Sequence, residues 1–486
     1  MVATECAPAA KAGGLGDMVS GLSRELELRG NAVEVILPKY ASMRYSDIWG
    51  LQPTYHDLWV PWYEGAVRCT VWFGYANGRK CFFIEPHSAA NFFGRDRLYG
   101  YWDDAERFAF FSKAALEFML RADKRPDVIH CHDWQTGLVP VLLYEQYGEV
   151  MPDQRVCYTI HNFRHQGTST EDVLWATQLG QREYFMDADR LGDDFRYRGL
   201  NPMKGGMVYS NFVTTVSPSH ADEALYGDAS SGLGRTLKEY QDKFRGILNG
   251  VDYDAWNPEK DAILPAHYSI DTIERKSENT QALRDRLLLR ETRRPVVAYV
   301  GRLDEQKGMH LVHHALFYTL ARGGQFVLIG DAHHHDGIND HFRHLKDYLN
   351  DNPDCHLELG YGEELAHLVY AGADLLVVPS MFEPCGLAPL IAMRYGTVPV
   401  VRATGGMIDT VFDRDDSGRP LAERNGYVFH HTDNRAIESA LSRALRLWST
   451  RPAEFRKLVA TCMRADYSWA RPGQEYLDIY EYIRHK

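Results

Sequence analysis

The sequence has few cysteines for its length and no long apolar run. Its eight cysteines are scattered over 486 residues without a C-x-x-C pair, which is typical of reduced thiols in a packed core rather than of a disulfide framework. No run of about 18 apolar residues occurs, so we expect no membrane-spanning helix. The start, MVATECAPAAKAGG, has neither a basic nor an apolar segment, so we expect no signal peptide.

Positive charge is scarce as well. The chain carries 54 Lys and Arg against 66 Asp and Glu, a formal net charge of −12. This balance is unsuited to binding nucleic acid over a broad face, although a few local cations suffice for a small phosphate ester. The composition, 45% hydrophobic and 25% charged, excludes a mostly disordered, collagen-like or coiled-coil chain. We expect an enzyme or binding protein of a cytosol-like compartment or of an organelle.

Short apolar runs alternate with amphipathic stretches along the chain. Seven runs rich in Val and Ile predict strands that are buried on both faces, at residues 32–38, 127–132, 156–161, 296–301, 326–330, 375–380 and 398–403. Helical patterns lie between them, for example at 17–30, 104–122 and 310–323. This alternation predicts an α/β protein with doubly wound parallel sheets.

The alternation occurs twice, which indicates two domains. We predict a Rossmann-like domain over 1–252, a second over 253–465, and a C-terminal helix over 466–486 that returns to the first domain. Ligands of open α/β sheets bind at the carboxyl ends of the strands. The site is therefore expected where two such sets of strand ends face each other across a cleft.

A glycine-rich loop, K-A-G-G-L-G-D, opens the first predicted helix at Lys11–Asp17. Adjacent glycines let the backbone approach a ligand closely, a helix N-terminus offers free N–H groups to an anion, and Lys11 adds a positive charge. The spacing is neither G-x-G-x-x-G nor a Walker A loop, so it does not indicate a dinucleotide or P-loop site. An ordinary loop with an exposed lysine is an equally good interpretation of the residues alone.

Three motifs of the second half also follow predicted strands. In VGRLDEQKG (300–308), Arg302 and Lys307 are suited to clamp a diphosphate, although a solvated loop with two basic residues is the alternative. Glu383 comes just after the predicted strand at 375–380. A carboxylate at this point can accept hydrogen bonds from sugar hydroxyls. The turn at Thr404–Gly405 is either an anion site or an ordinary strand-to-helix loop.

Two motifs of the first half, HCHDW (130–134) and TIHNF (159–163), each follow a buried strand. We expect Asp133 and His161 to point into the same cleft. His130 and His132 alternate along their strand, and we expect only one of them to face that cleft.

Two segments are rich in histidine and are therefore candidates for metal sites, but neither is a good one. The spacing in HCHD fits no common zinc site, and HHHD (333–336), with His341 and His344, is better explained as a solvated loop. No H-E-x-x-H, no G-x-S-x-G and no nucleophile with an adjacent base occurs in the sequence.

Together these motifs resemble those of bacterial glycogen synthases and plant starch synthases, a family of retaining glycosyltransferases with the GT-B fold. K-A-G-G-L-G-D is similar to the family's K-x-G-G-L-G/A-D loop. The other segments follow in the family's order, namely HCHDWQTGLVP, YTIHNFRHQG, GILNGVDYDAWNP, VGRLDEQKG, FEPCGLAPLIAMRYG and RATGGMIDTVFD. The stretches VILPKY, ERFAFFSKAALEF and IAMRYG look most like class III and IV soluble starch synthases, which favours starch synthase over glycogen synthase.

The resemblance implies roles for individual residues. The residues implied to bind the donor, ADP-glucose, are Lys11, Gly13, Gly14, Asn249, Arg302, Lys307, Tyr361, Glu383, Cys385, Gly386, Leu387, Thr404 and Gly405. Among them, Tyr361 would stack on adenine and Glu383 would face the transferred glucose. Asp133 and His161 would flank the acceptor 4-hydroxyl and the glucose 6-hydroxyl. The implied catalytic set is Glu383, His161, Asp133, Lys11, Arg302 and Lys307.

The implied reaction extends the non-reducing end of an α-1,4-glucan or maltooligosaccharide by one glucose, releases ADP and retains the anomeric configuration. Ile391 stands where related retaining families carry a second glutamate, and no carboxylate pair suited to double displacement is evident. We therefore expect attack on the face that ADP leaves, with the leaving phosphate taking the acceptor proton. Neither a cofactor nor a metal is expected, because the cations of the site can stabilise the departing ADP.

Other functions remain open at this point. A UDP-glucose-dependent GT-B transferase and a catalytically silent glucan-binding protein with the same fold are the alternatives. A glucan phosphorylase would need a lysine that binds pyridoxal phosphate, and no matching motif is found. The family implies a bacterial cytoplasm, or a plastid stroma if a transit peptide has been removed. Only four residues precede Glu5, so we expect that Met1 is not the natural start.

Overall fold

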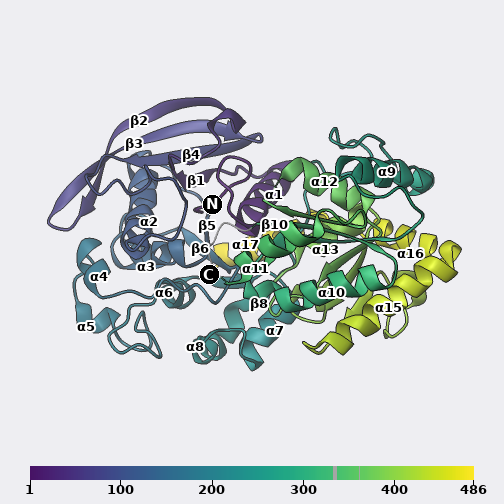
Figure 1. The fold of residues 1–486 in the computed structure, drawn as a ribbon. Helices are drawn as coiled ribbons and strands as arrows, with labels where there is room; N and C mark the ends of the chain where they lie inside the picture. Colours follow the sequence, from purple (N-terminus) through teal and green to yellow (C-terminus); the bar gives the residue numbers. More distant parts are fainter. Residues whose placement is uncertain (332–336, 361) are drawn as a thin grey trace. The chain divides into compact units, whose positions relative to one another are not determined.

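The computed structural model describes residues 1–331, 337–360 and 362–486. The chain divides into two compact units, which we call unit 1 (Met1–Gly250 with Trp469–Lys486) and unit 2 (Val251–Ser468) (Figure 1). Each unit has its own core of buried apolar side chains. Within the described ranges, no helix has the length and apolar character needed to cross a membrane.

Unit 1 is built on two four-stranded groups, in the orders β1-β4-β3-β2 and β5-β6-β7-β8. Its strands are β1 (Val35–Pro38), β2 (Ile48–Trp62), β3 (Gly65–Ala76), β4 (Arg79–Pro86), β5 (Val128–His132), β6 (Arg155–Ile160), β7 (Phe212–Thr215) and β8 (Phe244–Gly246). Val2 joins the two groups, because it forms parallel bridges to Ile36 of β1 and to Cys131 of β5. The run β5-β6-β7-β8 is parallel throughout.

The antiparallel part of unit 1 was not predicted from the sequence. β2 pairs with β3, and β3 pairs with β4, both antiparallel. β2 is long and mostly exposed, and its register with β3 shifts at three places. These irregularities break the strict alternation that identifies a strand in a sequence, which is why only the buried parallel strands were recognised.

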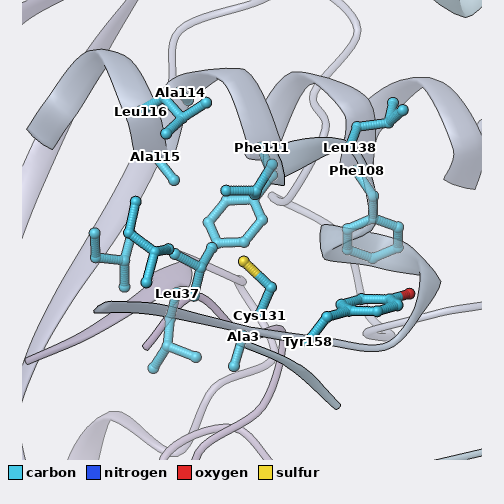
Figure 2. Close-up of a cluster of buried hydrophobic side chains, with 14 of the residues drawn as sticks. Ala3, Leu37, Phe108, Phe111, Ala114, Ala115, Leu116, Cys131, Leu138 and Tyr158 are labelled. Atoms are coloured by element: carbon cyan, nitrogen blue, oxygen red, sulfur yellow. The ribbon is translucent and has the colours of Figure 1, made fainter. Parts of the chain in front are cut away.

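Helices cover the sheet of unit 1. They are α1 (Gly14–Leu28), α2 (Asp104–Arg121), α3 (Leu138–Glu145), α4 (Asp172–Ala176), α5 (Arg182–Phe185), α6 (Pro202–Tyr209), α7 (Pro218–Tyr226), α8 (Gly234–Glu239) and α17 (Ala470–Arg484). Figure 2 shows α2 laid over the strands, with Phe111 directed at Cys131 of β5 and Leu37 of β1 beside them. The last helix, α17, packs on α1 and β6, where the ring of Trp469 fills the space that a side chain at Gly21 would need.

Unit 2 contains one parallel six-stranded sheet in the order β11-β10-β9-β12-β13-β14. Its strands are β9 (Val296–Arg302), β10 (Gln325–Asp331), β11 (Cys355–Leu359), β12 (Leu375–Val378), β13 (Val398–Arg402) and β14 (Tyr427–Phe429). Its helices are α9 (Lys276–Arg286), α10 (Met309–Ala321), α11 (Gly337–Leu349), α12 (Glu363–Gly372), α13 (Leu387–Arg394), α14 (Gly406–Thr410), α15 (Asn434–Thr450) and α16 (Pro452–Arg464). The strand order reverses between β9 and β12, as in doubly wound folds.

The predicted α/β fold is confirmed. All seven predicted strands are present, as β1, β5, β6, β9, β10, β12 and β13, and the three quoted helical patterns are α1, α2 and α10. All eight cysteines are free and buried, as the scattered spacing indicated. The fold therefore brings the loops that follow β5, β6, β9, β12 and β13 to the carboxyl ends of parallel strands, where open α/β sheets bind ligands.

Candidate active site

The glycine-rich loop of unit 1 is held by a buried carboxylate, Glu5. Its Oε2 accepts the backbone N–H groups of Ala12, at 2.7 Å, and Gly13, at 2.9 Å, while its Oε1 accepts the hydroxyl of Tyr99 at 2.8 Å. Burial raises the pKa of Glu5 above its ordinary value. Lys11 lies on the outer side of the same loop, with Nζ 2.7 Å from Oδ1 of Asp17. The loop is thus fixed from within, and its lysine is left accessible.

Gly13 caps the N-terminus of α1, whose first residue is Gly14. An added Cβ at Gly13 would meet no heavy atom within 4 Å, and the backbone there is extended, with φ −158°. Neither packing nor a left-handed conformation therefore requires a glycine. Space beside an exposed helix N-terminus is what a bound anion needs.

Asp133 and His161 follow the neighbouring parallel strands β5 and β6, and the structure brings them together. The backbone N–H of His161 donates to Oδ1 of Asp133 at 2.7 Å. Asp133 has a left-handed backbone, with φ 57°, a strained conformation that is common at functional sites. Burial raises the pKa of Asp133 to about 7 and lowers the pKa of His161 to about 3. Near neutral pH the imidazole of His161 is therefore uncharged, and the carboxyl of Asp133 is about half protonated.

The expectation that only one of His130 and His132 faces the site rests on the premise that the two residues alternate along their strand, and this premise is wrong. Residues two apart on a strand share a face, and the two rings lie together with centroids 4.2 Å apart. Nδ1 of His132 is 3.3 Å from Nε2 of His161, whereas His130 bonds Tyr480 of α17 at 2.7 Å and Thr159 at 2.6 Å. No group of three or more His, Cys, Asp or Glu residues suited to a metal occurs in the described ranges.

A cavity of about 540 Å³ opens beside Trp134, the residue after Asp133. Its lining combines the rings of Trp134 and Phe195 with polar side chains, among them Arg164, Gln166 and Asp193. Phe195 is 80% exposed, so its ring is accessible to a ligand. This cavity was not predicted, although Trp134 and residues 164–167 belong to the segments HCHDWQTGLVP and YTIHNFRHQG, because a sequence does not show which loops lie beside each other.

The two predicted cationic residues of unit 2 lie at the end of β9 and just after it, because Arg302 is the last residue of that strand and Lys307 ends the short 3-10 helix Glu305–Lys307. Nζ of Lys307 donates to Oε2 of Glu383 at 2.6 Å, and the hydroxyl of Ser380 donates to the same oxygen at 2.8 Å. Their side chains are 19% and 12% exposed for Lys307 and Glu383, so this ion pair is partly shielded. Arg302 is more open, at 56%, with Nη1 3.1 Å from Oδ2 of Asp304. Lys307 and Glu383 are 76 residues apart in sequence and are brought together by the parallel sheet.

The turns after β12 and β13 pack directly on each other. Gly405 has φ 47°, and a Cβ there would lie 2.1 Å from the carbonyl oxygen of Glu383, so only glycine fits. Gly386 caps α13 with φ 85°, and Cys385 and Leu387 flank it. Thr404 is buried beside Gly405. The two turns thus bring the predicted residues Glu383, Cys385–Leu387 and Thr404–Gly405 into one cluster.

Comparison with known proteins identifies the family. The family model described as starch synthase catalytic domain matches residues 1–239, and the model for glycosyl transferases group 1 matches residues 281–457. Glycogen synthase 1 of Synechococcus sp. (strain JA-3-3Ab) is 62% identical over 487 residues, covering 100% of this chain and 99% of the relative. The chain belongs to the glycogen and starch synthase family.

Two other relatives of this synthase are informative. Glycogen synthase 2 of Methylococcus capsulatus is 60% identical, with both chains covered fully. The catalytic domain of starch synthase IV from Arabidopsis thaliana, solved with ADP and acarbose, is 40% identical with a TM-score of 0.97, covering 100% of this chain and 99% of that one. Of these relatives, the glycogen synthases are the more similar in sequence. The two-unit architecture of the synthase is the GT-B fold of glycosyltransferases.

The predicted site of the synthase also includes Asn249 and Tyr361, and Glu5 lies beside it. Asn249 is buried, and its Oδ1 has no hydrogen-bond partner among the residues that the structure describes, so an acceptor atom is left for a ligand. Tyr361 and the segment 333–336 lie outside the described residues. Glu5 was missed as a site residue, although a glutamate six positions before the glycine-rich loop at Lys11, in an otherwise apolar stretch, was a usable signal.

Proposed function

We propose that this synthase transfers glucose from ADP-glucose to the non-reducing end of an α-1,4-glucan, with retention of configuration. The observation that carries the proposal is the cluster of Arg302, Lys307 and Glu383 at the strand ends of unit 2. A diphosphate needs cations, and a glucose needs a fixed hydrogen-bond acceptor beside them. The ADP and acarbose bound by the 40%-identical starch synthase IV domain support the same pair of ligands.

The donor would be held mainly by unit 2. Arg302 and Lys307 would bind the diphosphate, and the turns at Cys385–Leu387 and Thr404–Gly405 would add backbone N–H groups. Glu383 would accept hydrogen bonds from the transferred glucose, with Lys307 and Ser380 fixing its carboxylate. From unit 1, Lys11, Gly13, Gly14 and Asn249 would contribute to the donor site. We retain the stacking of Tyr361 on adenine as part of the proposal.

The acceptor would be held by unit 1. His161 offers a neutral imidazole and Asp133 a carboxyl whose pKa burial raises to about 7, and both can form hydrogen bonds with the hydroxyls of a neutral sugar. The cavity beside Trp134 and Phe195 has exposed rings and polar side chains, a combination that suits the flat faces and hydroxyls of a glucan. The proposed domain roles are therefore the acceptor for 1–252 with 466–486, and the nucleotide sugar for 253–465.

The chemistry would proceed on one face of the sugar. As the bond between the anomeric carbon and the β-phosphate oxygen breaks, Arg302 and Lys307 stabilise the charge that develops on ADP. The acceptor 4-hydroxyl attacks the same face, and its proton passes to the departing phosphate oxygen. No second carboxylate is needed, which agrees with Ile391 at the position eight residues after Glu383. Because both named glycogen synthases are bacterial, we place the reaction in a bacterial cytoplasm.

The decisive experiment follows labelled glucose from ADP-glucose into maltoheptaose, with product lengths and ADP release measured together. We expect products longer by whole glucose units that an α-1,4-specific amylase digests completely, because retention forms α-linkages. UDP-glucose in a parallel assay tests the donor, and faster release of UDP than of ADP would replace the proposed donor. Binding of the glucan without elongation from either donor would instead support the silent glucan-binding protein.

A further inference from the structure

Three histidines of unit 1, of which His130 and His132 are buried and His161 is partly buried, form a connected cluster, and the proposed reaction uses only His161. His130 and His132 lie side by side on β5 with ring centroids 4.2 Å apart, and His132 reaches His161 after β6. His130 is bonded at both ring nitrogens, by Tyr480 at 2.7 Å and Thr159 at 2.6 Å. The ring of His132 thus lies between His130, which is held by its own hydrogen bonds, and the candidate site residue His161.

The hydrogen bond between His132 and His161 contains a single proton. Burial lowers the pKa of both rings far below 6.5, to about 3 for His161, so both are neutral at physiological pH. A neutral imidazole has one N–H donor and one acceptor nitrogen. The 3.3 Å contact between Nδ1 of His132 and Nε2 of His161 must therefore be a bond with either ring as the donor.

The surroundings of His132 select the direction of this bond. Its Nε2 is buried and has no hydrogen-bond partner within the part of the chain that the structure describes. If the proton of His132 were on Nε2, a buried N–H would remain unbonded, which is rare in folded proteins. If the proton is on Nδ1, it is used in the bond to His161, and only a lone pair is left without a partner.

We propose that His132 is a positioning residue that donates its Nδ1–H to Nε2 of His161 and so holds His161 in the tautomer protonated at Nδ1. The consequence rests on the proposed function, in which His161 contacts a sugar hydroxyl. His161 then meets that hydroxyl with an N–H donor. The opposite tautomer would present a lone pair to the hydroxyl, and its N–H would be consumed by His132.

The tautomer can be measured without any assay of activity. The synthase labelled with ¹⁵N-histidine gives ring-nitrogen resonances in long-range ¹H–¹⁵N NMR spectra, where protonated and unprotonated nitrogens are well separated. The signals of His132 and His161 are assigned by their loss in His132→Asn and His161→Gln. We expect protonated Nδ1 in both rings. A His161 protonated at Nε2 in the unaltered protein would overturn the inference, whatever the catalytic result.

Two isosteric variants of His132 test the consequence for turnover. His132→Asn places an amide N–H close to the position of Nδ1, whereas His132→Gln places its amide near Nε2 and leaves the bond to His161 without a donor. We expect kcat within about threefold of the unaltered protein for the Asn variant and about tenfold lower for the Gln variant, the effect of one lost hydrogen bond. Equal losses of kcat in the two variants would contradict the positioning role.

A control separates positioning from stability. Tyr480→Phe removes a hydrogen bond from the same cluster without altering the contact between His132 and His161, and we expect its kcat to stay within about twofold. Melting temperatures of all variants are recorded beside kcat, and His161 should keep its protonated Nδ1 in the Asn variant but not in the Gln variant. If the unaltered protein transfers no glucose at all, the proposed function fails, while the NMR result still decides the tautomer.

Discussion

Unit 1 and unit 2 place different chemistry at the ends of their parallel strands. In unit 1, burial lowers the pKa of three histidines at the ends of β5 and β6, which are therefore neutral near pH 7, and raises the pKa of Asp133 to about 7, so that this carboxyl is about half protonated there. In unit 2, the groups after β9 and β12 are charged and more open, with Arg302 at 56% exposure. The same fold thus supplies a hydrogen-bonding surface in one unit and an ionic one in the other.

The difference follows from solvent access. A charge needs either water or a close partner, and Lys307 and Glu383 have each other at 2.6 Å, whereas Asp133 is held by backbone N–H groups alone. Desolvation without an opposite charge favours the neutral form of a group. Neutral groups suit a sugar, and charged groups suit a diphosphate. The following predictions test this contrast, from the largest expected effect to the smallest.

Lys307→Ala should lower kcat at least about a hundredfold, because it removes a cation from the departing ADP and leaves Glu383 without its partner. Steady-state ADP release measures the effect. Lys346→Ala removes another lysine of unit 2 that is paired to a glutamate, Glu358, and should leave kcat unchanged. A loss of less than about threefold for Lys307→Ala would rule out contact with the leaving phosphate.

Arg302→Lys should raise the KM for ADP-glucose about tenfold, since an ammonium cannot reproduce the two-pronged contact of a guanidinium with a diphosphate. Isothermal titration calorimetry with ADP compares the ADP affinity of Arg302→Lys with that of the unaltered protein without any turnover. The exposed Arg293 in the same unit is the control position, at which Lys should change nothing. An unchanged ADP affinity in Arg302→Lys would place the diphosphate elsewhere.

Asp133→Asn should change the pH dependence of stability. The folded-state pKa of about 7 lies above the ordinary value of 3.8, so folded protein binds more protons than unfolded protein between these values. The unaltered protein should therefore lose about 1–3 kcal/mol of unfolding free energy relative to Asp133→Asn as the pH rises through that window. Denaturant titrations at several pH values measure the difference.

The exposed Asp153 provides the comparison for this prediction. Asp153→Asn makes the same chemical change at the surface and should leave the unfolding free energy within about 0.5 kcal/mol of that of the unaltered protein in the same titrations. If the unfolding free energy of Asp133→Asn differs from that of the unaltered protein by the same amount at every pH, folding does not favour the protonated form of Asp133. That result would contradict the contrast between the two units.

Removal of metal ions should have the smallest effect. If Arg302 and Lys307 supply the positive charge that the leaving group needs, exhaustive dialysis against EDTA should keep transferase activity within about twofold. Activity that EDTA abolishes and magnesium restores would show that these side chains are insufficient.

Residues next to buried Val-rich strands were the most predictable part of the molecule. Lys11, Asp133, His161, Arg302 and Glu383 stand directly after recognisable strands or open a helix, and the alternation of elements places such residues at one edge of a sheet. The contact between Lys307 and Glu383 was not predicted, because side-chain pairing depends on rotamers and on loop geometry. The hydrogen bond between His132 and His161 depends on strand register in the same way.

The parts missed by the sequence analysis share a physical cause. The antiparallel strand β2 is mostly exposed and its register with β3 shifts at three places, so it leaves no strict alternation in the sequence. The cavity beside Trp134 is assembled from separate loops. Glu5 acts by accepting two N–H groups from residues seven and eight positions later, a contact that exists only once the loop has folded.

The membership of Trp469–Lys486 in unit 1 sets an order of events during synthesis on the ribosome. Residues 1–250 leave the ribosome long before α17 exists, so the nascent unit lacks the indole that fills the space at Gly21 and the phenol that bonds His130. The histidine cluster can reach its final arrangement only after Tyr480 has been translated. A nascent chain stalled before Trp469 would therefore carry His130, His132 and His161 without the helix that completes their support.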